Sequence, residues 1–261
     1  MKLSIFGAAL FVSVHALASM PPHPFAVRDL VMLDRISDPQ VSPDGKRVVY
    51  QVRETDYEAN RGRNGIWALI LAEGKASPSR MTDPAVNATS PRWSADGKSV
   101  FYLAKGGDAM RLWRQEWADP PEPISIQTDP ATPYQRIPLV KHGSDAMQIT
   151  DFALDINAYK LSQDGKQVLL AIDTYSGCEK ESDPIACTER RLDEKGKSKA
   201  TGRVYEKLFI RHWDTWADGF RSQLYIAAFD ANGKIGTPRL VAKGIDGDTP
   251  SKPFGGDDDF A

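Results

Sequence analysis

The feature that most constrains the fold of this chain is a short motif that occurs three times. Its core reads Ser-x-Asp-Gly-Lys-x-Val before an apolar pair, and the copies begin at Ser42, Ser94 and Ser162. Asp-Gly is a strong hairpin signal because the turn needs a positive φ, which glycine adopts without penalty. Ser and Asp side chains also bind nearby backbone amides, and β-branched or aromatic residues follow each turn. We therefore predict three hairpins with these turn residues: Asp44, Gly45, Asp96, Gly97, Asp164 and Gly165.

The spacing of these turns indicates what the hairpins build. The turn aspartates are 52 and 68 residues apart, and further strand candidates fill the intervals. About four short strands per repeat of roughly 40–50 residues is typical of a β-propeller blade. We predict an all-β fold, a partial β-propeller of about three four-stranded blades plus the start of a fourth. The additional candidate strands are Gly65–Leu71, Leu112–Trp117, Pro123–Ile126, Val204–Trp213 and Leu224–Phe229.

The first residues have the pattern of an export signal. Lys2 precedes an apolar run over Leu3–Val14, and Ala16-Leu17-Ala18 fits the small-x-small cleavage rule. A membrane span needs about 20 apolar residues, so this run is short for a span. We predict a signal peptide over residues 1–18, cleaved after Ala18, with no stable membrane insertion afterwards and a periplasmic or secreted product. A buried core helix and an uncleaved anchor remain alternatives.

Sequence patterns divide the rest of the chain into two segments. Residues 19–38 are predicted as a lead-in segment with a short helix within Phe25–Ile36, where apolar residues recur near helical spacing. Residues 39–261 are predicted as the incomplete propeller domain. The third repeat is longer because of an insertion at 175–201, in which the charged stretch Glu189–Lys199 is expected to be exposed.

The two cysteines, Cys178 and Cys187, lie within this insertion. An even, closely spaced pair in an exported chain predicts a disulfide, with two free thiols as the alternative. Zinc would need further ligands, and no histidine lies within twenty residues of the pair. The four histidines are His15, His23, His142 and His212.

The net charge and the placement of the acidic residues argue against particular kinds of ligand. With 33 basic and 35 acidic side chains the net charge is −2, which argues against nucleic-acid binding. The acidic residues near the C-terminus lack the spacing of a calcium loop and are expected to be turn residues. We predict no metal and no cofactor. The acidic residues are Asp246, Asp248, Asp257, Asp258 and Asp259.

The blade motif, followed by a β-branched strand, resembles that of TolB-like proteins and of prolyl oligopeptidase-family serine peptidases. The opening Leu33–Gly45 and the stretch Arg211–Gly219 (RHWDTWADG) are similar to the bacterial dipeptidyl-peptidase and acylaminoacyl-peptidase branch. The resemblance covers roughly residues 28–261. It implies an N-terminal propeller followed by an α/β-hydrolase domain with a Ser-Asp-His triad.

The chain departs from that family in its catalytic motifs. No Gly-x-Ser-x-Gly occurs, and no histidine follows His212. His212 and Asp214 would share one face of a strand, but no nucleophile is placed beside them, so we expect a polar belt that fixes blade packing around Trp213 and Trp216. We assign no catalytic residue, and since no adjacent Glu pair exists, no substrate-binding residue either.

Two functions compete. The first is the non-catalytic propeller portion of a secreted serine exopeptidase of the dipeptidyl-peptidase type. That portion would gate the access of short peptides to a catalytic domain before which this chain is truncated, and would be inactive by itself. The alternative is a stand-alone TolB-like periplasmic protein-binding propeller. Three blades argue against it, because an open arc leaves two blade faces bare.

Overall fold

A computed structural model describes residues 24–72, 75–118, 146–202, 204–205, 211–213, 215–216 and 218–261 of the chain. The predicted signal peptide and the strand candidate Pro123–Ile126 lie outside the described residues. In the part that is described, no helix is both long enough and apolar enough to cross a membrane.

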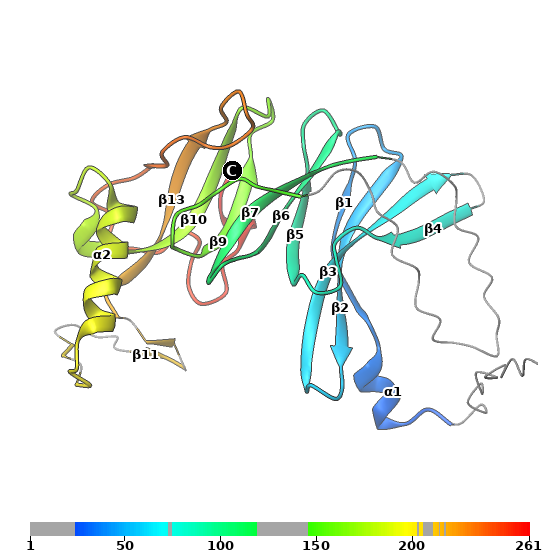
Figure 1. Ribbon diagram of the computed structural model, residues 1–261, viewed down its shortest axis with the longest axis horizontal. Coiled ribbons are helices and arrows are strands. Elements are labelled where there is room, and N and C mark those ends of the chain that lie inside the picture. The colour runs from blue at the N-terminus through cyan, green and yellow to red at the C-terminus, as the bar shows by residue number, and fades with distance from the viewer. Residues whose placement is uncertain are drawn as a thin grey trace, which may run out of the picture.

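Three antiparallel four-stranded sheets follow one another along the chain and lie side by side like blades (Figure 1). The first contains β1 (Arg35–Val41), β2 (Arg47–Asp56), β3 (Arg61–Ala72) and β4 (Lys75–Arg80). The second contains β5 (Ala88–Trp93), β6 (Ser99–Gly106), β7 (Ala109–Glu116) and β8 (Met147–Gln148). The third contains β9 (Ile156–Leu161), β10 (Gln167–Tyr175), β13 (Phe220–Ala228) and β14 (Arg239–Leu240). This arrangement confirms the predicted all-β partial propeller.

The remaining elements are short. They are α1 (Val27–Met32), α2 (Pro184–Lys197), the two-stranded hairpin of β11 (Arg211–His212) and β12 (Thr215–Trp216), and the 3-10 turns η1 (Ser176–Cys178) and η2 (Asp257–Asp259).

The structure corrects one strand prediction and agrees with the predicted helix. Of the strand candidate Val204–Trp213, Arg211–His212 forms β11 of a separate two-stranded hairpin. The described strands of the third sheet are β9, β10, β13 and β14, with β13 paired to β10 over nine residue pairs. The reason is that the insertion runs on to Gly219 before the alternating pattern of β13 begins. The predicted short helix within Phe25–Ile36 is present as α1, which ends at Met32 before Ile36 pairs with Val52 in the first sheet.

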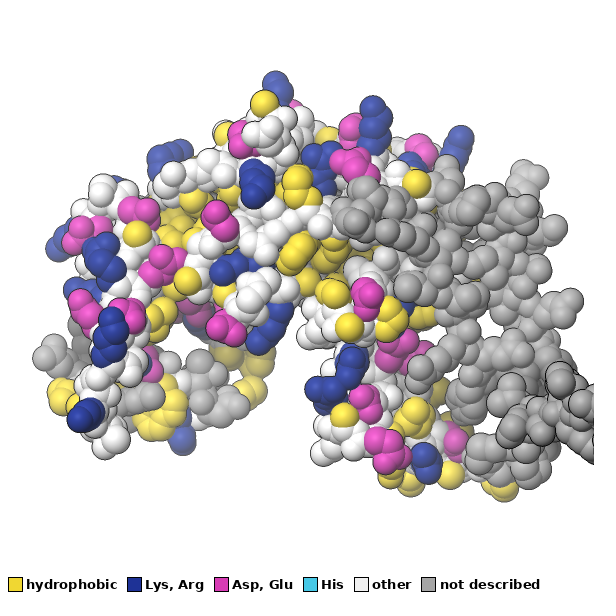
Figure 2. All heavy atoms as spheres, in the orientation of Figure 1, with side chains coloured by type: hydrophobic (Ala, Val, Ile, Leu, Met, Phe, Trp, Pro, Cys, Tyr) yellow, Lys and Arg dark blue, Asp and Glu magenta, His cyan; other side chains and the backbone are white. Residues whose placement is uncertain are grey.

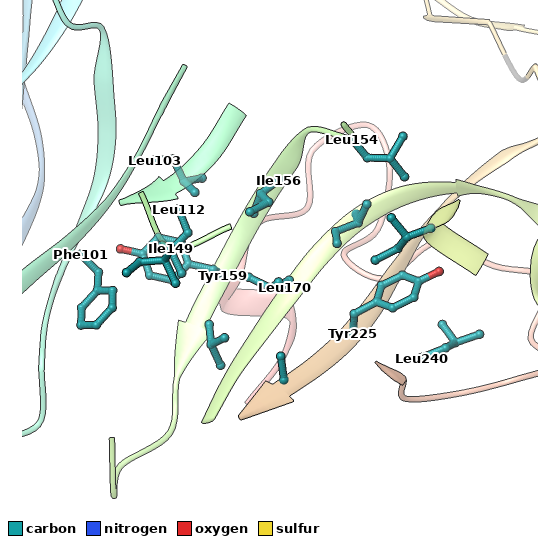
Figure 3. Close-up of a cluster of buried hydrophobic side chains, with 14 residues drawn as sticks. Phe101, Leu103, Leu112, Ile149, Leu154, Ile156, Tyr159, Leu170, Tyr225 and Leu240 are labelled. Carbon is teal, nitrogen blue, oxygen red and sulfur yellow. The ribbon is translucent and has the colours of Figure 1, made fainter. Parts of the chain in front are cut away.

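The core lies between neighbouring sheets. Phe101, Leu112, Tyr159 and Leu170 belong to a cluster shared by the second and third sheets (Figure 3), and a separate cluster around Val49 joins the first and second. Full burial of such side chains contributes about 1.5–3 kcal/mol each. Each sheet therefore depends on its neighbour for stability.

Polar bonds between blades fix their relative position. The Trp93 indole donates to the backbone oxygen of Gln40 at 3.0 Å, which joins the second sheet to the first. The Tyr159 hydroxyl donates to the backbone oxygen of Ser90 at 2.8 Å, which joins the third to the second. A buried polar group costs free energy unless it is bonded, so these contacts select one packing of the sheets.

The connections divide the arc into two ends. The β1–β2, β5–β6 and β9–β10 turns lie at one end, which we call the turn end. The β2–β3 loop, α1 and the insertion after β10 lie at the opposite end, which we call the insertion end (Figure 1).

Candidate functional site

The predicted turn residues form one repeated hydrogen-bond unit at the turn end. In the first copy the Ser42 hydroxyl donates to the Asp44 carboxylate at 2.5 Å, and the same carboxylate oxygen accepts from the Lys46 amide at 3.1 Å. Ser42 Oγ also accepts from the Arg47 amide at 3.0 Å. Gly45 has φ +70°, as the sequence requires of it. The bonds recur around Asp96 and Asp164.

These bonds alter the acidity of the three aspartates. The serine hydroxyl first, and then the lysine amide, stabilise the carboxylate and lower the pKa of Asp44, Asp96 and Asp164 below the usual value. Each carboxylate is thus held ionised by its own turn. The turns therefore shape the hairpins, and their serine and aspartate oxygens are engaged in hydrogen bonds within the turn.

The insertion is tied to the third sheet at its base. Cys178 and Cys187, the predicted pair, form a disulfide bond with the Cα atoms 5.7 Å apart. Asp183 caps α2 by accepting from the Ala186 amide at 3.0 Å, and Pro184 occupies the first helical turn. Thr188 accepts from the Tyr175 amide at 3.0 Å, which anchors the helix to the end of β10. The predicted exposed stretch Glu189–Lys199 is mostly helix, and its residues from Arg190 onward are exposed.

A cleft of about 1470 Å³ opens at the insertion end, between the insertion, the start of β13 and the C-terminal segment. The charged side chains of its polar wall form ion pairs with one another. Asp173 accepts from the Asn157 amide group at 2.9 Å and forms an ion pair with Lys252. Arg221 contacts Asp246 at 2.9 Å and Asp248 at 4.0 Å. Figure 2 shows that the molecule is hollowed at this end of the arc.

Aromatic residues form another part of the cleft wall. The Tyr205 and Trp216 rings stack with centroids 5.8 Å apart, and the Tyr205 hydroxyl bonds Asp218 at 3.1 Å. The Arg211 guanidinium lies 5.3 Å from the Trp216 ring centroid. The described part of the wall contains no histidine. The described cleft is therefore lined by aromatic rings and by polar side chains that are paired with one another.

The stretch Arg211–Gly219, singled out in the sequence, forms the β11–β12 hairpin beside this cleft. Trp213 and Trp216 are 70% and 46% exposed, so the expectation that they are packed between blades is wrong. They lie on the β11–β12 hairpin, which is separate from the three four-stranded sheets. The pair His212 and Asp214 lies outside the described side chains.

A cluster that the sequence analysis missed lies on the inner strands. Arg92 on β5 contacts Asp38 of the first sheet at 2.7 Å and Asp257 near the C-terminus at 2.6 Å. Lys160 on β9 donates to the backbone oxygens of Asp257 and Phe260. Both cations stand two positions before the serine of the repeat, and this shared register is the signal that was available.

A second missed repeat follows the outer strands. Met81-Thr82-Asp83 and Ile149-Thr150-Asp151 occupy equivalent places after β4 and β8. The Thr82 and Thr150 hydroxyls accept from the amides of Ile66 and Leu112 at 3.0 and 3.1 Å. These buried threonines bond the connection between blades to the third strand of each sheet.

Comparison with known proteins extends this picture. No protein-family model matches the chain. Dipeptidyl-peptidase 5 of Porphyromonas endodontalis is 28% identical over 232 residues, which is 89% of this chain and 28% of that protein. Dipeptidyl-peptidase 5 of Porphyromonas gingivalis is 28% identical over 229 residues, 88% of this chain and 28% of that protein. The chain is homologous to dipeptidyl-peptidase 5. It spans little more than a quarter of the length of these dipeptidyl-peptidase 5 relatives.

The fold agrees with a solved peptidase. The acylaminoacyl peptidase of Pyrococcus horikoshii superposes with a TM-score of 0.50 and 14% identity, covering 80% of this chain and 26% of that chain. At this identity the likeness concerns the fold. Together with the homology to dipeptidyl-peptidase 5, it confirms the resemblance to the propeller part of prolyl oligopeptidase-family peptidases.

Proposed function

We propose that this chain is the propeller portion of an exported serine exopeptidase of the dipeptidyl-peptidase type, and that it admits short peptides to a separate hydrolase domain. The observation that carries the proposal is the homology to dipeptidyl-peptidase 5 over 89% of the chain. The blade architecture supports it, because the blades of a propeller are arranged around a central channel and three of them form part of its wall.

In this proposal the separate hydrolase domain, and not this chain, carries out the hydrolysis of the peptide. The sequence contains no Gly-x-Ser-x-Gly, the turn in which an α/β-hydrolase carries its nucleophile. The contribution of this chain is selection by size. A folded protein is too large to pass through the central channel of a propeller, whereas an extended peptide of a few residues is not. The export pattern of residues 1–18 and the disulfide of Cys178 and Cys187 support a periplasmic or secreted location.

The first test uses the purified chain. It is incubated with dipeptidyl p-nitroanilide substrates and with a fluorophosphonate that labels active-site serines. We expect neither release of nitroaniline nor labelling. Turnover together with stoichiometric labelling would show that the chain carries its own catalytic centre and would overturn the proposal.

The second test examines whether the propeller portion controls which substrates reach the hydrolase domain. The 232 aligned residues of the Porphyromonas endodontalis relative are replaced by those of this chain. We expect this chimera to cleave dipeptidyl p-nitroanilides and to leave the termini of a folded protein intact. Removal of dipeptides from the folded protein as fast as from a short peptide would contradict gating.

A further inference from the structure

The stretch at the end of α2 is the most exposed part of the described chain. Residues 190–202 are all exposed, and no other run of consecutive exposed residues in the described ranges is as long. The helix ends at Lys197, and residues 198–202 have no regular secondary structure. Five residues of this run are basic, and the function proposed above gives none of them a role. The basic residues are Arg190, Arg191, Lys195, Lys197 and Lys199.

The backbone after the helix has the form in which an endopeptidase binds its substrate. Ser198 has φ −71° and ψ 133°, which is an extended conformation. Within the described ranges, no backbone hydrogen bond joins Lys199, Thr201 or Gly202 to another residue. Small side chains surround Lys199 on both sides, so the lysine is the one long side chain between 198 and 202. Exposed segments of this kind are preferred sites of proteolytic nicking, because little structure has to open before the chain enters a protease.

Lys199 also lacks the contacts that hold other lysines of the chain. Lys195 and Lys197 form ion pairs at 3.3 and 2.6 Å. Lys199 forms no ion pair with any residue that the structure describes. The exposed lysines of the turn end differ in their backbone, since the Lys166 amide donates to the Asp164 carboxylate at 3.0 Å within a tight turn. The turn would have to break before a protease could bind it, whereas the chain around Lys199 is already extended.

We propose that the peptide bond between Lys199 and Ala200 is a processing site for an endopeptidase whose acidic S1 pocket selects a basic side chain. As the bond breaks, one water molecule supplies a hydroxyl group to the Lys199 carbonyl carbon and a hydrogen to the Ala200 nitrogen. No further reactant is needed. The inference does not depend on the function proposed above, because it concerns only the exposed part of the insertion.

The two pieces of the cut chain stay assembled. β10 belongs to the N-terminal piece and β13 to the C-terminal piece, and these strands pair over nine residue pairs. Leu170 and Tyr225, one from each piece, are fully buried in the same core cluster. The disulfide does not link the pieces, because Cys178 and Cys187 both lie before the cut. The pieces therefore remain together in the native protein and separate on denaturation without a reductant.

Cleavage divides the wall of the cleft. Lys195 on α2 lines the cleft and belongs to the N-terminal piece, whereas Tyr205 and Trp216 line it from the C-terminal piece. The ion pair of Lys195 with Asp218 also joins the pieces, but its lysine side chain is 55% exposed, and such pairs contribute about 0–1 kcal/mol. After the cut, the wall that contains Tyr205 and Trp216 is attached covalently only where β13 begins. The cleft can then widen while the third sheet keeps its pairing.

The first test is limited proteolysis of the purified chain with trypsin under native conditions. We expect the first new N-terminus to be Ala200, formed at least about tenfold faster than any other. Lys199→Gln should slow the first cleavage at least about tenfold, whereas the matched variant Lys166→Gln, at the turn end, should be cut as fast as the parent chain. The pieces should elute together in size-exclusion chromatography and separate on a non-reducing denaturing gel. A first cut at any other position, or pieces that elute apart, would overturn the proposal.

The second test examines the protein isolated from the organism that carries the gene. We expect two polypeptides, the second of which begins at Ala200, and a single polypeptide when the gene encodes Lys199→Gln. Hydrogen–deuterium exchange then compares the cut and uncut forms. Amides of the β11–β12 hairpin should exchange on the order of tenfold faster in the cut form, and those of β10 and β13 should exchange equally in both. A single uncut polypeptide from the natural source would overturn the processing site, and equal exchange of the hairpin would contradict the widening of the cleft.

Discussion

The turn end and the insertion end are built by different means on the same three sheets. At the turn end one motif is used three times, and in each copy the serine hydroxyl donates to the aspartate two positions later. At the insertion end the third blade departs from the repeat, and a disulfide, a helix and a hairpin replace a short loop. The turn end therefore maintains the fold, whereas the insertion end is the region in which the third blade differs from the first two.

The largest expected effect tests whether both ends depend on a common core. Leu170 is fully buried between the second and third sheets, so Leu170→Ala should cost about 2–5 kcal/mol of the free energy of unfolding, measured by urea titration. Leu192→Ala, on the exposed part of α2, is the control and should stay within about 0.5 kcal/mol. Similar losses for the two variants would mean that the described core does not support the sheets.

The next effect concerns the insertion alone. In the variant Cys178→Ala, Cys187→Ala the ten-residue loop is no longer closed, which should cost about 2.5–3 kcal/mol. Because α2 is anchored through Cys187 and Thr188, the loss should appear as faster proteolysis and faster amide exchange in 176–198. Amides of the β9–β10 turn should be unaffected. Faster exchange at both ends would show that the insertion is not an independent unit.

One substitution should have opposite signs at the two ends. Gly45→Ala places a Cβ on a residue with φ +70° and should destabilise the chain by about 1 kcal/mol, although nothing lies within 4 Å of that Cβ. Gly196→Ala, in α2 and equally open, should stabilise it by about 0.5 kcal/mol because alanine favours the helix. Thermal unfolding of both variants measures the difference. The same sign for both would contradict the assigned backbone conformations.

The smallest effect is a pH dependence at the turn end. The three turn aspartates have a lower pKa folded than unfolded, so they stabilise the fold above about pH 4, and this contribution is lost as the pH falls through the folded pKa. Because the serine hydroxyl is the main cause, Ser42→Ala, Ser94→Ala, Ser162→Ala together should flatten the decrease in urea midpoint between pH 5 and pH 3. Ser251→Ala, beside Asp259 at the insertion end, should flatten it less. If the triple variant leaves the pH dependence of the urea midpoint unchanged, the serine hydrogen bond is not the cause of that dependence.

The same comparison explains what the sequence could predict. The turns can be predicted because their geometry is local, since residues within five positions supply the bonds of each serine and aspartate. The Asp183-Pro184 helix start is also a local signal, and the charge of the run after it indicates exposure without specifying a helix. The contact of Arg92 with Asp38 and Asp257 joins residues 54 and 165 positions apart, and no local pattern specifies such a pairing. The exposed tryptophans were placed wrongly because their exposure depends on what surrounds the hairpin.

The base of the insertion has a consequence for how such chains diversify. The polypeptide leaves the third sheet after Tyr175 and returns at Phe220, and these two residues are paired partners in the ladder. The Ser176 amide bonds the Gly219 oxygen at 2.9 Å and closes this neck. The ladder below the neck is complete without the forty or so residues beyond it. The segment can therefore change in length or sequence without interrupting the pairing of β10 with β13 in the blade beneath it.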